Sequence, residues 1–106
     1  MPRSKKYTEL LIEALKDPKE AIGYLNAVLE DVRNDDSKEA QEALLLALKD
    51  IAESQGGITR LSRKTGLARE SLYKTLSSRG NPRLSTITAL VQALGFDFKF
   101  YIPVKR

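Results

Sequence analysis

The chain has 106 residues, a formal net charge of +4 and a hydrophobic fraction of 42%, which suit one domain with a modest core. It contains neither cysteine nor histidine, which rules out disulfides and thiolate zinc sites and disfavours most hydrolytic and metal-dependent chemistries. No run of about 20 apolar residues could span a membrane, and no apolar secretion segment follows the basic N-terminus. We therefore expect a cytoplasmic protein that is not an enzyme and that has no catalytic residue, metal or cofactor.

The first two predicted helices precede a leucine-rich stretch. Apolar residues at helical spacing predict an amphipathic helix over residues 7–16. Asp17 can then cap a second helix, Pro18 suits its first position, and Glu20 can close a capping box. This second helix should extend to about Asp31.

A third helix should follow a polar turn. Either Asp36 or Ser37 can cap it, and a stripe of leucines extends through it to about Gln55. The glycine pair at 56–57 should end it. We expect this helix to be the scaffold on which the next two helices dock.

Residues 58–76 predict two short helices joined at Gly66. Leu61 on the first helix and Leu72 on the second begin apolar stripes that can pack across each other. Glycine suits the left-handed residue that ends a helix. The polar positions between are basic, apart from Glu70. Crossed helices, a glycine turn and a basic face are typical of a helix-turn-helix that reads the major groove of DNA.

Other interpretations of the same stretch remain open. An αα-hairpin in a bundle can carry a basic face that is merely solvated. Ser62 stands where such a motif usually has a small apolar residue, so its hydroxyl needs a partner. Ala68 occupies the capping position of the second helix without a side chain that can cap.

The end of the chain predicts a loop, a helix and a strand. Residues 77–82 form a loop by composition, Ser85 caps a helix of about ten residues, and Gly95 stops it. From residue 96 to 103, apolar and polar residues alternate, which indicates a strand with one apolar face.

This lone strand needs a partner, because nothing else in the chain indicates β-structure. The partner could be the same strand of a second copy or an edge strand of another protein. We assign dimerisation to Phe98, Phe100 and Ile102. The alternative is a coil whose phenylalanines plug the core.

Charge divides the chain into two unlike halves. Residues 1–56 carry eight basic and twelve acidic side chains (8 − 12 = −4), whereas residues 57–106 carry ten and two (10 − 2 = +8). A basic half attracts the DNA backbone through counterion release, and an acidic half is repelled by it. We therefore expect the first half to face away from DNA.

Residues 61–76 resemble the helix-turn-helix of phage-repressor-like (Cro/Xre-type) regulators and, more specifically, that of the small addiction-module antidote proteins encoded beside a toxin. The resemblance continues over most of the remaining chain, through residues 17–26, the leucine-rich helix, and residues 80–82, 84–86 and 93–95.

We therefore predict a mainly α fold, a phage-repressor-like helix-turn-helix bundle of five to six helices with a short C-terminal β-strand. Residues 1–35 would form an N-terminal helical extension that could bind a toxin. Residues 36–106 would form the DNA-binding domain and include the strand.

The resemblance implies two activities. One is repression of the protein's own operon as a homodimer on double-stranded operator DNA. The other is neutralisation of a cognate toxin, often a small basic ribonuclease that cleaves messenger RNA. The −4 charge of the first half would complement a basic toxin, although an acidic, solvated helix face gives the same charge. A phage-type transcriptional regulator without a toxin partner and a helical adaptor that never touches nucleic acid are the alternatives.

The segment 68–77 would enter the major groove with its N-terminal end first. Arg69 is the best candidate for a bidentate contact to guanine O6 and N7. Glu70 can accept a hydrogen bond from cytosine or pair with Lys74, and Tyr73 can contact a thymine methyl group or a phosphate. The predicted base-reading residues are Arg69, Glu70, Tyr73 and Lys74. The predicted phosphate-binding residues, which position the domain, are Arg60, Arg63, Lys64, Arg79, Asn81 and Arg83.

Overall fold

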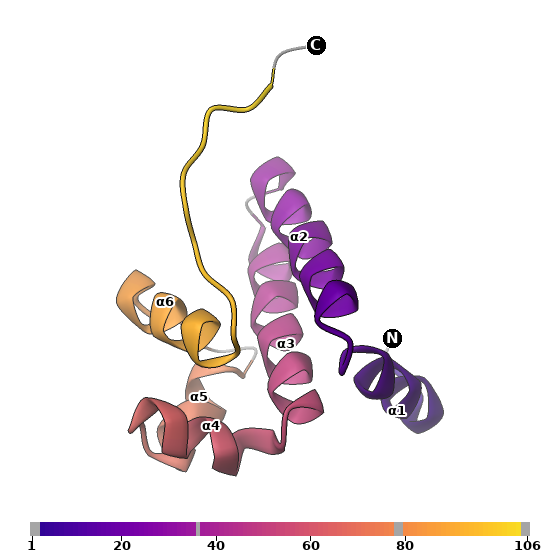
Figure 1. The fold of residues 1–106 in the computed structure, drawn as a ribbon, viewed down its shortest axis with the longest axis vertical. Helices are drawn as coiled ribbons and strands as arrows, with labels where there is room; N and C mark the ends of the chain where they lie inside the picture. Colours follow the sequence, from indigo (N-terminus) through magenta and orange to yellow (C-terminus); the bar gives the residue numbers. More distant parts are fainter. Residues whose placement is uncertain (1–2, 36, 78–79, 105–106) are drawn as a thin grey trace.

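The computed structural model describes residues 3–35, 37–77 and 80–104, and these ranges contain six α-helices. Figure 1 shows α2 and α3 side by side, with α1 next to the lower end of α3 and the last three helices at the other side. None of the described helices has both the length and the apolar character needed to cross a membrane. The helices are α1 (Lys5–Ala14), α2 (Pro18–Asn34), α3 (Lys38–Ser54), α4 (Gly57–Thr65), α5 (Arg69–Thr75) and α6 (Leu84–Ala93).

Two of the predicted helix caps are confirmed. The side chain of Asp17 accepts the N–H of Lys19 at 2.9 Å, with proline at the first helical position of α2. The hydroxyl of Ser37 accepts the N–H of Ala40 at 3.2 Å and caps α3. The alternative cap, Asp36, lies outside the described residues.

Other predicted helix limits were wrong by a few residues. Helix α1 begins at Lys5, because the hydroxyl of Ser4 accepts the N–H of Tyr7 at 3.0 Å and caps the chain earlier than the apolar pattern indicated. Helix α2 continues to Asn34. Helix α6 begins before Ser85, so this residue lies in its first turn and does not cap it.

The core is centred on α3. Leu48 and Ile51 of this helix are fully buried, and they belong to one cluster with Leu61 of α4, Leu72 of α5 and Leu90 of α6. Burying one such side chain contributes roughly 1.5–3 kcal/mol. Helices α1, α2 and α4 all pack directly on α3. Helix α3 therefore joins the acidic first half to the basic second half.

A buried carboxylate on α3 fastens the N-terminal segment. Asp50 is 3% exposed, and its two oxygens accept hydrogen bonds from Arg3 Nη1 and Nη2, each at 3.0 Å. The hydroxyl of Tyr24, on α2, donates a third bond at 2.9 Å. A buried charge is tolerated when its lone pairs are satisfied in this way. Asp50 thus holds the segment before α1 and the middle of α2 against α3.

This network should be visible in the titration of Tyr24. Burial and the hydrogen bond to Asp50 raise its pKa to about 12, from an ordinary value of 10.0. Because the pKa of Tyr24 is higher in the folded than in the unfolded chain, its contribution to the stability of the folded state is complete below about pH 10. This contribution is lost as the pH rises toward about 12. We expect the difference in phenolate absorbance between the wild type and Tyr24→Phe to have its midpoint near the raised value. A midpoint at the ordinary value would contradict the hydrogen bond.

The predicted C-terminal strand is wrong, since residues 96–104 form neither helix nor strand. The N–H of Phe96 donates to the carbonyl of Val91 at 3.0 Å, and the chain then leaves the helices, as Figure 1 shows. A strand requires a paired ladder, and the described part of this chain offers no partner. Phe96 packs against the core, but Phe100 is completely exposed, so the phenylalanines do not all plug the core either.

Candidate nucleic-acid interface

Helices α4 and α5 are joined by a glycine turn held by side chains. Gly66 has a φ of +74° and donates its N–H to the Ser62 carbonyl at 2.9 Å. This left-handed conformation favours glycine. The Ser62 hydroxyl donates to the Leu67 carbonyl at 2.5 Å, which supplies the partner that this hydroxyl needs. The Thr65 hydroxyl donates to the Leu61 carbonyl at 2.9 Å and accepts the N–H of Leu67 at 3.2 Å.

Helix α5 is anchored by its inner face alone. Leu72 is fully buried, and Leu76, directly after the helix, is 4% exposed. Ala68 lies at the N-cap and makes no side-chain capping bond, as its lack of a polar group predicts. The predicted base-reading residues Arg69, Glu70, Tyr73 and Lys74 are all exposed.

The Glu70–Lys74 ion pair that the spacing favours does not form among the described residues, where the ion pairs join other side chains. Both side chains are exposed. An exposed pair at this spacing would contribute only about 0.3–0.5 kcal/mol. Both side chains are therefore available to other partners at little cost.

The basic side chains of α4 differ in how firmly they are held. Lys64 Nζ donates to the Ala93 carbonyl at 3.4 Å, at the C-terminal end of α6, where the helix dipole favours a cation. Arg60 Nη1 donates to the Gln55 carbonyl at 3.3 Å, after α3. Arg63 is exposed, and no hydrogen bond of its side chain occurs among the described residues. Arg63 is therefore the freest cation of α4.

The remaining predicted phosphate-binding residues lie in the loop before α6. Asn81 and Arg83 are exposed, whereas Arg79 lies outside the described residues. Gly80 brings this loop against the end of α5, because its N–H donates to the Ser77 carbonyl at 2.9 Å. A Cβ on Gly80 would stand 2.0 Å from the carbonyl oxygen of Thr75. Only glycine permits this approach.

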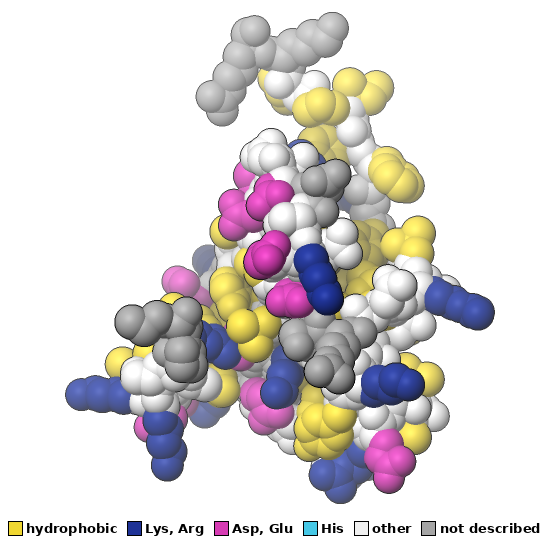
Figure 2. Space-filling model, turned by 180° about the vertical axis from the view of Figure 1, so that it is seen from behind, with side chains coloured by type: hydrophobic (Ala, Val, Ile, Leu, Met, Phe, Trp, Pro, Cys, Tyr) yellow, Lys and Arg dark blue, Asp and Glu magenta, His cyan; other side chains and the backbone are white. Residues whose placement is uncertain are grey.

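The surface carries one concentration of acidic side chains. Figure 2 shows acidic side chains gathered where α2 ends and α3 begins, while Lys and Arg side chains are spread over the middle and lower parts of the molecule among further acidic ones. This view also shows apolar side chains along the C-terminal segment.

A family model described as "Probable addiction module antidote protein" matches residues 7–102, which include α2 to α6 and most of α1. The chain belongs to this family. An antidote-family relationship also agrees with the resemblance seen in the sequence, and it supports an antitoxin role with a cognate toxin as partner. An uncharacterized protein of Haemophilus influenzae (strain ATCC 51907 / DSM 11121 / KW20 / Rd) is 34% identical over 87 residues, which cover 82% of this chain and 81% of that protein. No solved structure matches the chain.

Two features of this antidote-family chain were missed by sequence reasoning. One is the Arg3–Tyr24–Asp50 network, whose members are separated by 26 and 47 residues and carry no local signal. The other is the contact of Arg60 and Lys64 with the backbone carbonyls of Gln55, just after α3, and Ala93, at the end of α6. The sequence signal for the second feature is a basic residue about one helical turn from a glycine at a helix end, and this signal does not specify the partner.

Proposed function

We propose that this protein is a DNA-binding antitoxin that acts as a homodimer, represses its own toxin–antitoxin operon and neutralises a cognate toxin that cleaves messenger RNA. The observation that carries the DNA-binding part is α5 itself. This helix presents Arg69, Glu70, Tyr73 and Lys74 to solvent while Leu72 fixes it to the core. A DNA-recognition helix needs this arrangement, because the side chains that contact bases must be held in fixed positions by a rigid helix.

Base reading is assigned to the exposed side of α5. Arg69 lies in its first turn, the part of a recognition helix that meets base edges, and can bind guanine O6 and N7 together. Glu70 can accept from the amino group of cytosine. Tyr73, 48% exposed, can contact a thymine methyl group or a phosphate, and Lys74 extends the contact along the groove.

Phosphate binding is assigned to the flanks of α5. Arg63 on α4 and Asn81 and Arg83 before α6 are exposed, and α5 lies between these two segments in the chain. Arg60 and Lys64 add positive charge at fixed places, and Arg79 belongs to the same set. Each phosphate neutralised contributes a salt-dependent term of roughly −0.9 to the slope of log K against log salt.

Toxin binding is assigned to the acidic half, with residues 1–35 as its main part. Helix α1 contains no fully buried residue, and Tyr7 and Leu10 on this helix are exposed although they are large and apolar. An exposed apolar patch suits a protein partner, and the net charge of −4 of residues 1–56 suits a basic one. This surface belongs to the half of the chain that DNA repels.

Two arginine variants should separate base reading from phosphate binding. We expect Arg69→Ala to lose about 1–3 kcal/mol at the operator, a factor of roughly 5–150, with little change on random DNA. Arg63→Ala should weaken binding to both DNAs alike and reduce the salt slope by about 1. Fluorescence anisotropy over a salt series would measure this, with the protein's own upstream region and a scrambled duplex as probes.

The matched control is Lys19→Ala, which removes an exposed cation from α2, on the half that should not face DNA. It should leave both affinities unchanged. Equal losses for Arg69→Ala on the two DNAs would refute its base-reading role. Absence of operator binding by the wild type at low salt would refute DNA binding and favour the adaptor interpretation.

The toxin part is tested by co-expression with the neighbouring open reading frame, followed by co-purification. A stable complex that inhibits the neighbour's ribonuclease activity is the expected result. Operator binding without such a complex would instead identify a phage-type transcriptional regulator.

A further inference from the structure

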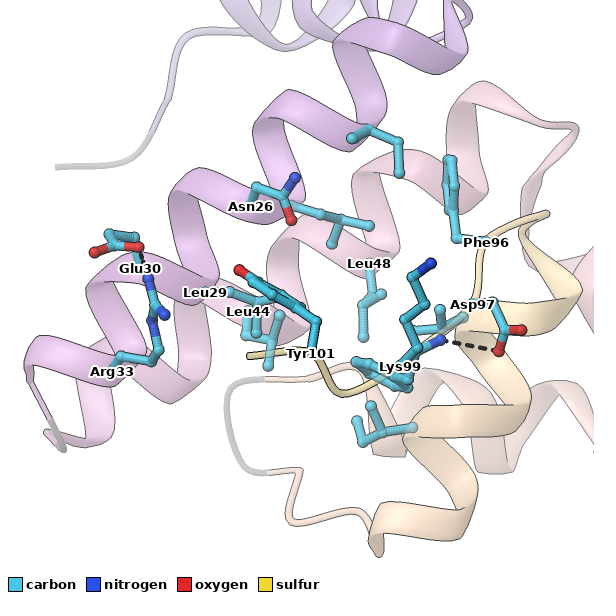
Figure 3. Close-up of a pocket in the computed structure, with 15 residues that line it drawn as sticks. Asn26, Leu29, Glu30, Arg33, Leu44, Leu48, Phe96, Asp97, Lys99 and Tyr101 are labelled. Carbon is cyan, nitrogen blue, oxygen red and sulfur yellow. Dashed lines mark hydrogen bonds and ion pairs between the residues drawn. The ribbon is translucent and has the colours of Figure 1, made fainter. Parts of the chain in front are cut away.

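A groove of about 560 Å³ lies on the side of the molecule away from α4 and α5. It is bounded by α2, α3, α6 and the beginning of the C-terminal tail, which we define as residues 97–104. Figure 3 shows Glu30 and Arg33 paired with each other at one end. The volume falls in the range of roughly 300–1,000 Å³ that binding sites usually occupy. Apolar side chains of α2, α3 and α6 line the groove together with two phenylalanines that follow α6: Ile22, Leu25, Leu29, Leu44, Leu48, Ile87, Val91, Phe96 and Phe98.

The tail has two chemically different sides. Phe98, Lys99 and Tyr101 line the groove, and Figure 3 shows Tyr101 beside Leu29 and Leu44. The other side carries three apolar side chains that touch almost nothing, since Phe100 is 104%, Ile102 92% and Val104 91% exposed. Successive side chains of an extended chain point to opposite sides. One tail therefore cannot bury both of its sides in its own groove.

The backbone of the tail is also unpaired. The N–H of Phe98 donates to the side chain of Asp97 at 2.9 Å, and residues 99–104 make no backbone–backbone hydrogen bond within the described chain. An extended segment with free N–H and C=O groups is a template for another extended segment. A partner that is both extended and apolar would therefore pair with the backbone of the tail and cover its apolar side.

We propose that this partner is the tail of a second copy, so that Phe100, Ile102 and Val104 of each chain sit in the groove of the other. The inference rests on the homodimer of the proposed function and assigns its interface. The two tails would lie side by side, each with its inner side on its own groove and its outer side on the other copy's groove. One twofold axis would generate both contacts.

Charge favours a second copy as the occupant. Residues 97–106 carry three basic and one acidic side chain, whereas residues 17–39, which include α2, carry seven acidic and three basic ones. The C-terminal segment 97–106 therefore has a net charge of +2 (3 − 1) and the segment 17–39 one of −4 (3 − 7), so these segments of two copies attract each other. This segment of the same chain has both the apolar pattern and the charge that the groove accepts.

The size of the interface is also adequate. A buried aromatic side chain covers roughly 150–250 Å², and twofold symmetry counts every contact twice. One aromatic and two aliphatic side chains from each tail, with the groove walls that they cover, reach the order of the roughly 1,200 Å² at the lower end of stable interfaces.

The absence of cysteine from the chain makes a cross-linking test clean. Asn26 is an exposed residue on the wall of the groove, and Ile102 lies on the outer side of the tail. We expect a mixture of Asn26→Cys and Ile102→Cys full-length proteins, treated with a short bismaleimide, to give a covalent dimer that contains one chain of each kind. Glu9→Cys, at an exposed position of α1 away from the groove, replaces Asn26→Cys in the control and should give none.

A second variant tests the same interface without a cross-linking reagent. Phe100→Ser with Ile102→Ser alters only side chains that are exposed in the single chain, so the helix content should not change. Sedimentation should nevertheless move from dimer to monomer, with weaker operator binding at low protein concentration.

Three outcomes would overturn the inference. Self-linking of Ile102→Cys without mixed dimers would mean that the tails pair only with each other. Intramolecular linking of Asn26→Cys/Ile102→Cys in one chain would mean that the tail straps its own groove. An unaltered dimer in the double serine variant would place the interface elsewhere. In each case, intact operator binding by the wild type would show that only this inference fails, whereas its loss would remove the proposed function as well.

Discussion

Asp50→Ala should lower the free energy of unfolding by about 2–4 kcal/mol, because it removes the acceptor of three hydrogen bonds at once. The variant leaves the Tyr24 hydroxyl and the Arg3 guanidinium without their partner. Breaking a fully buried pair costs about 3–5 kcal/mol. The Arg3 side chain is 27% exposed and can return to water, so we expect a smaller loss. Urea denaturation followed by circular dichroism would measure it.

Glu53→Ala is the matched control, since it removes another carboxylate from α3 at an exposed position. Its effect should stay within about 0.5 kcal/mol. The loss in Asp50→Ala should also release the segment before α1, so trypsin should cleave after Lys5 or Lys6 sooner than in the wild type. Equal stability of the two variants would mean that the Arg3–Tyr24–Asp50 network does not hold the N-terminal segment.

The helices could be predicted from the sequence because their signals are local. The caps at Asp17 and Ser37 act on N–H groups two or three residues away, and apolar periodicity is read within a few turns. The first cap was missed, although Ser4 has the right chemistry, because the apolar stripe begins only at Tyr7. The composition of the turn at Gly66 was likewise sufficient to predict its left-handed backbone.

The Asp50 network could not be predicted, because its meaning depends on the fold. In a count of charges Asp50 is one of twelve acidic residues of the first half, and most acidic residues are solvated. Only the packing of α2 on α3 brings Tyr24 within 2.9 Å. The fixing of Lys64 by the end of α6 depends on tertiary structure in the same way.

The C-terminal tail shows why alternation alone does not make a strand. The pattern of residues 96–103 is correct for one apolar face, but strand formation also requires a neighbour that supplies the ladder. The described part of a single chain has none. The side on which each α5 residue lies was, by contrast, predictable, because the inward position of Leu72 fixes the others on a rigid helix.

Leu72→Ala should be the most damaging change within α5. The Leu72 side chain lies wholly in the core, with an exposed fraction of 0%, and the helix has only seven residues. Removing a buried leucine side chain costs about 2–5 kcal/mol, partly through the cavity left behind. A chain of this size has about 5–15 kcal/mol of stability in total. We expect Leu72→Ala to unfold at a lower urea concentration than the wild type. At urea concentrations below that midpoint, the variant should bind operator and random DNA more weakly than the wild type does.

Leu67→Ala provides the comparison, because it makes the same substitution in the turn before α5 at a side chain that is 36% exposed. It should cost much less than Leu72→Ala. Neither leucine has the charge or the hydrogen-bonding groups that would read a base. The comparison therefore isolates the effect of anchoring α5 in the core. If Leu72→Ala lost stability but retained full operator affinity under native conditions, the base-reading side chains would not depend on the anchoring of α5. The assignment of DNA reading to this helix would then have to be abandoned.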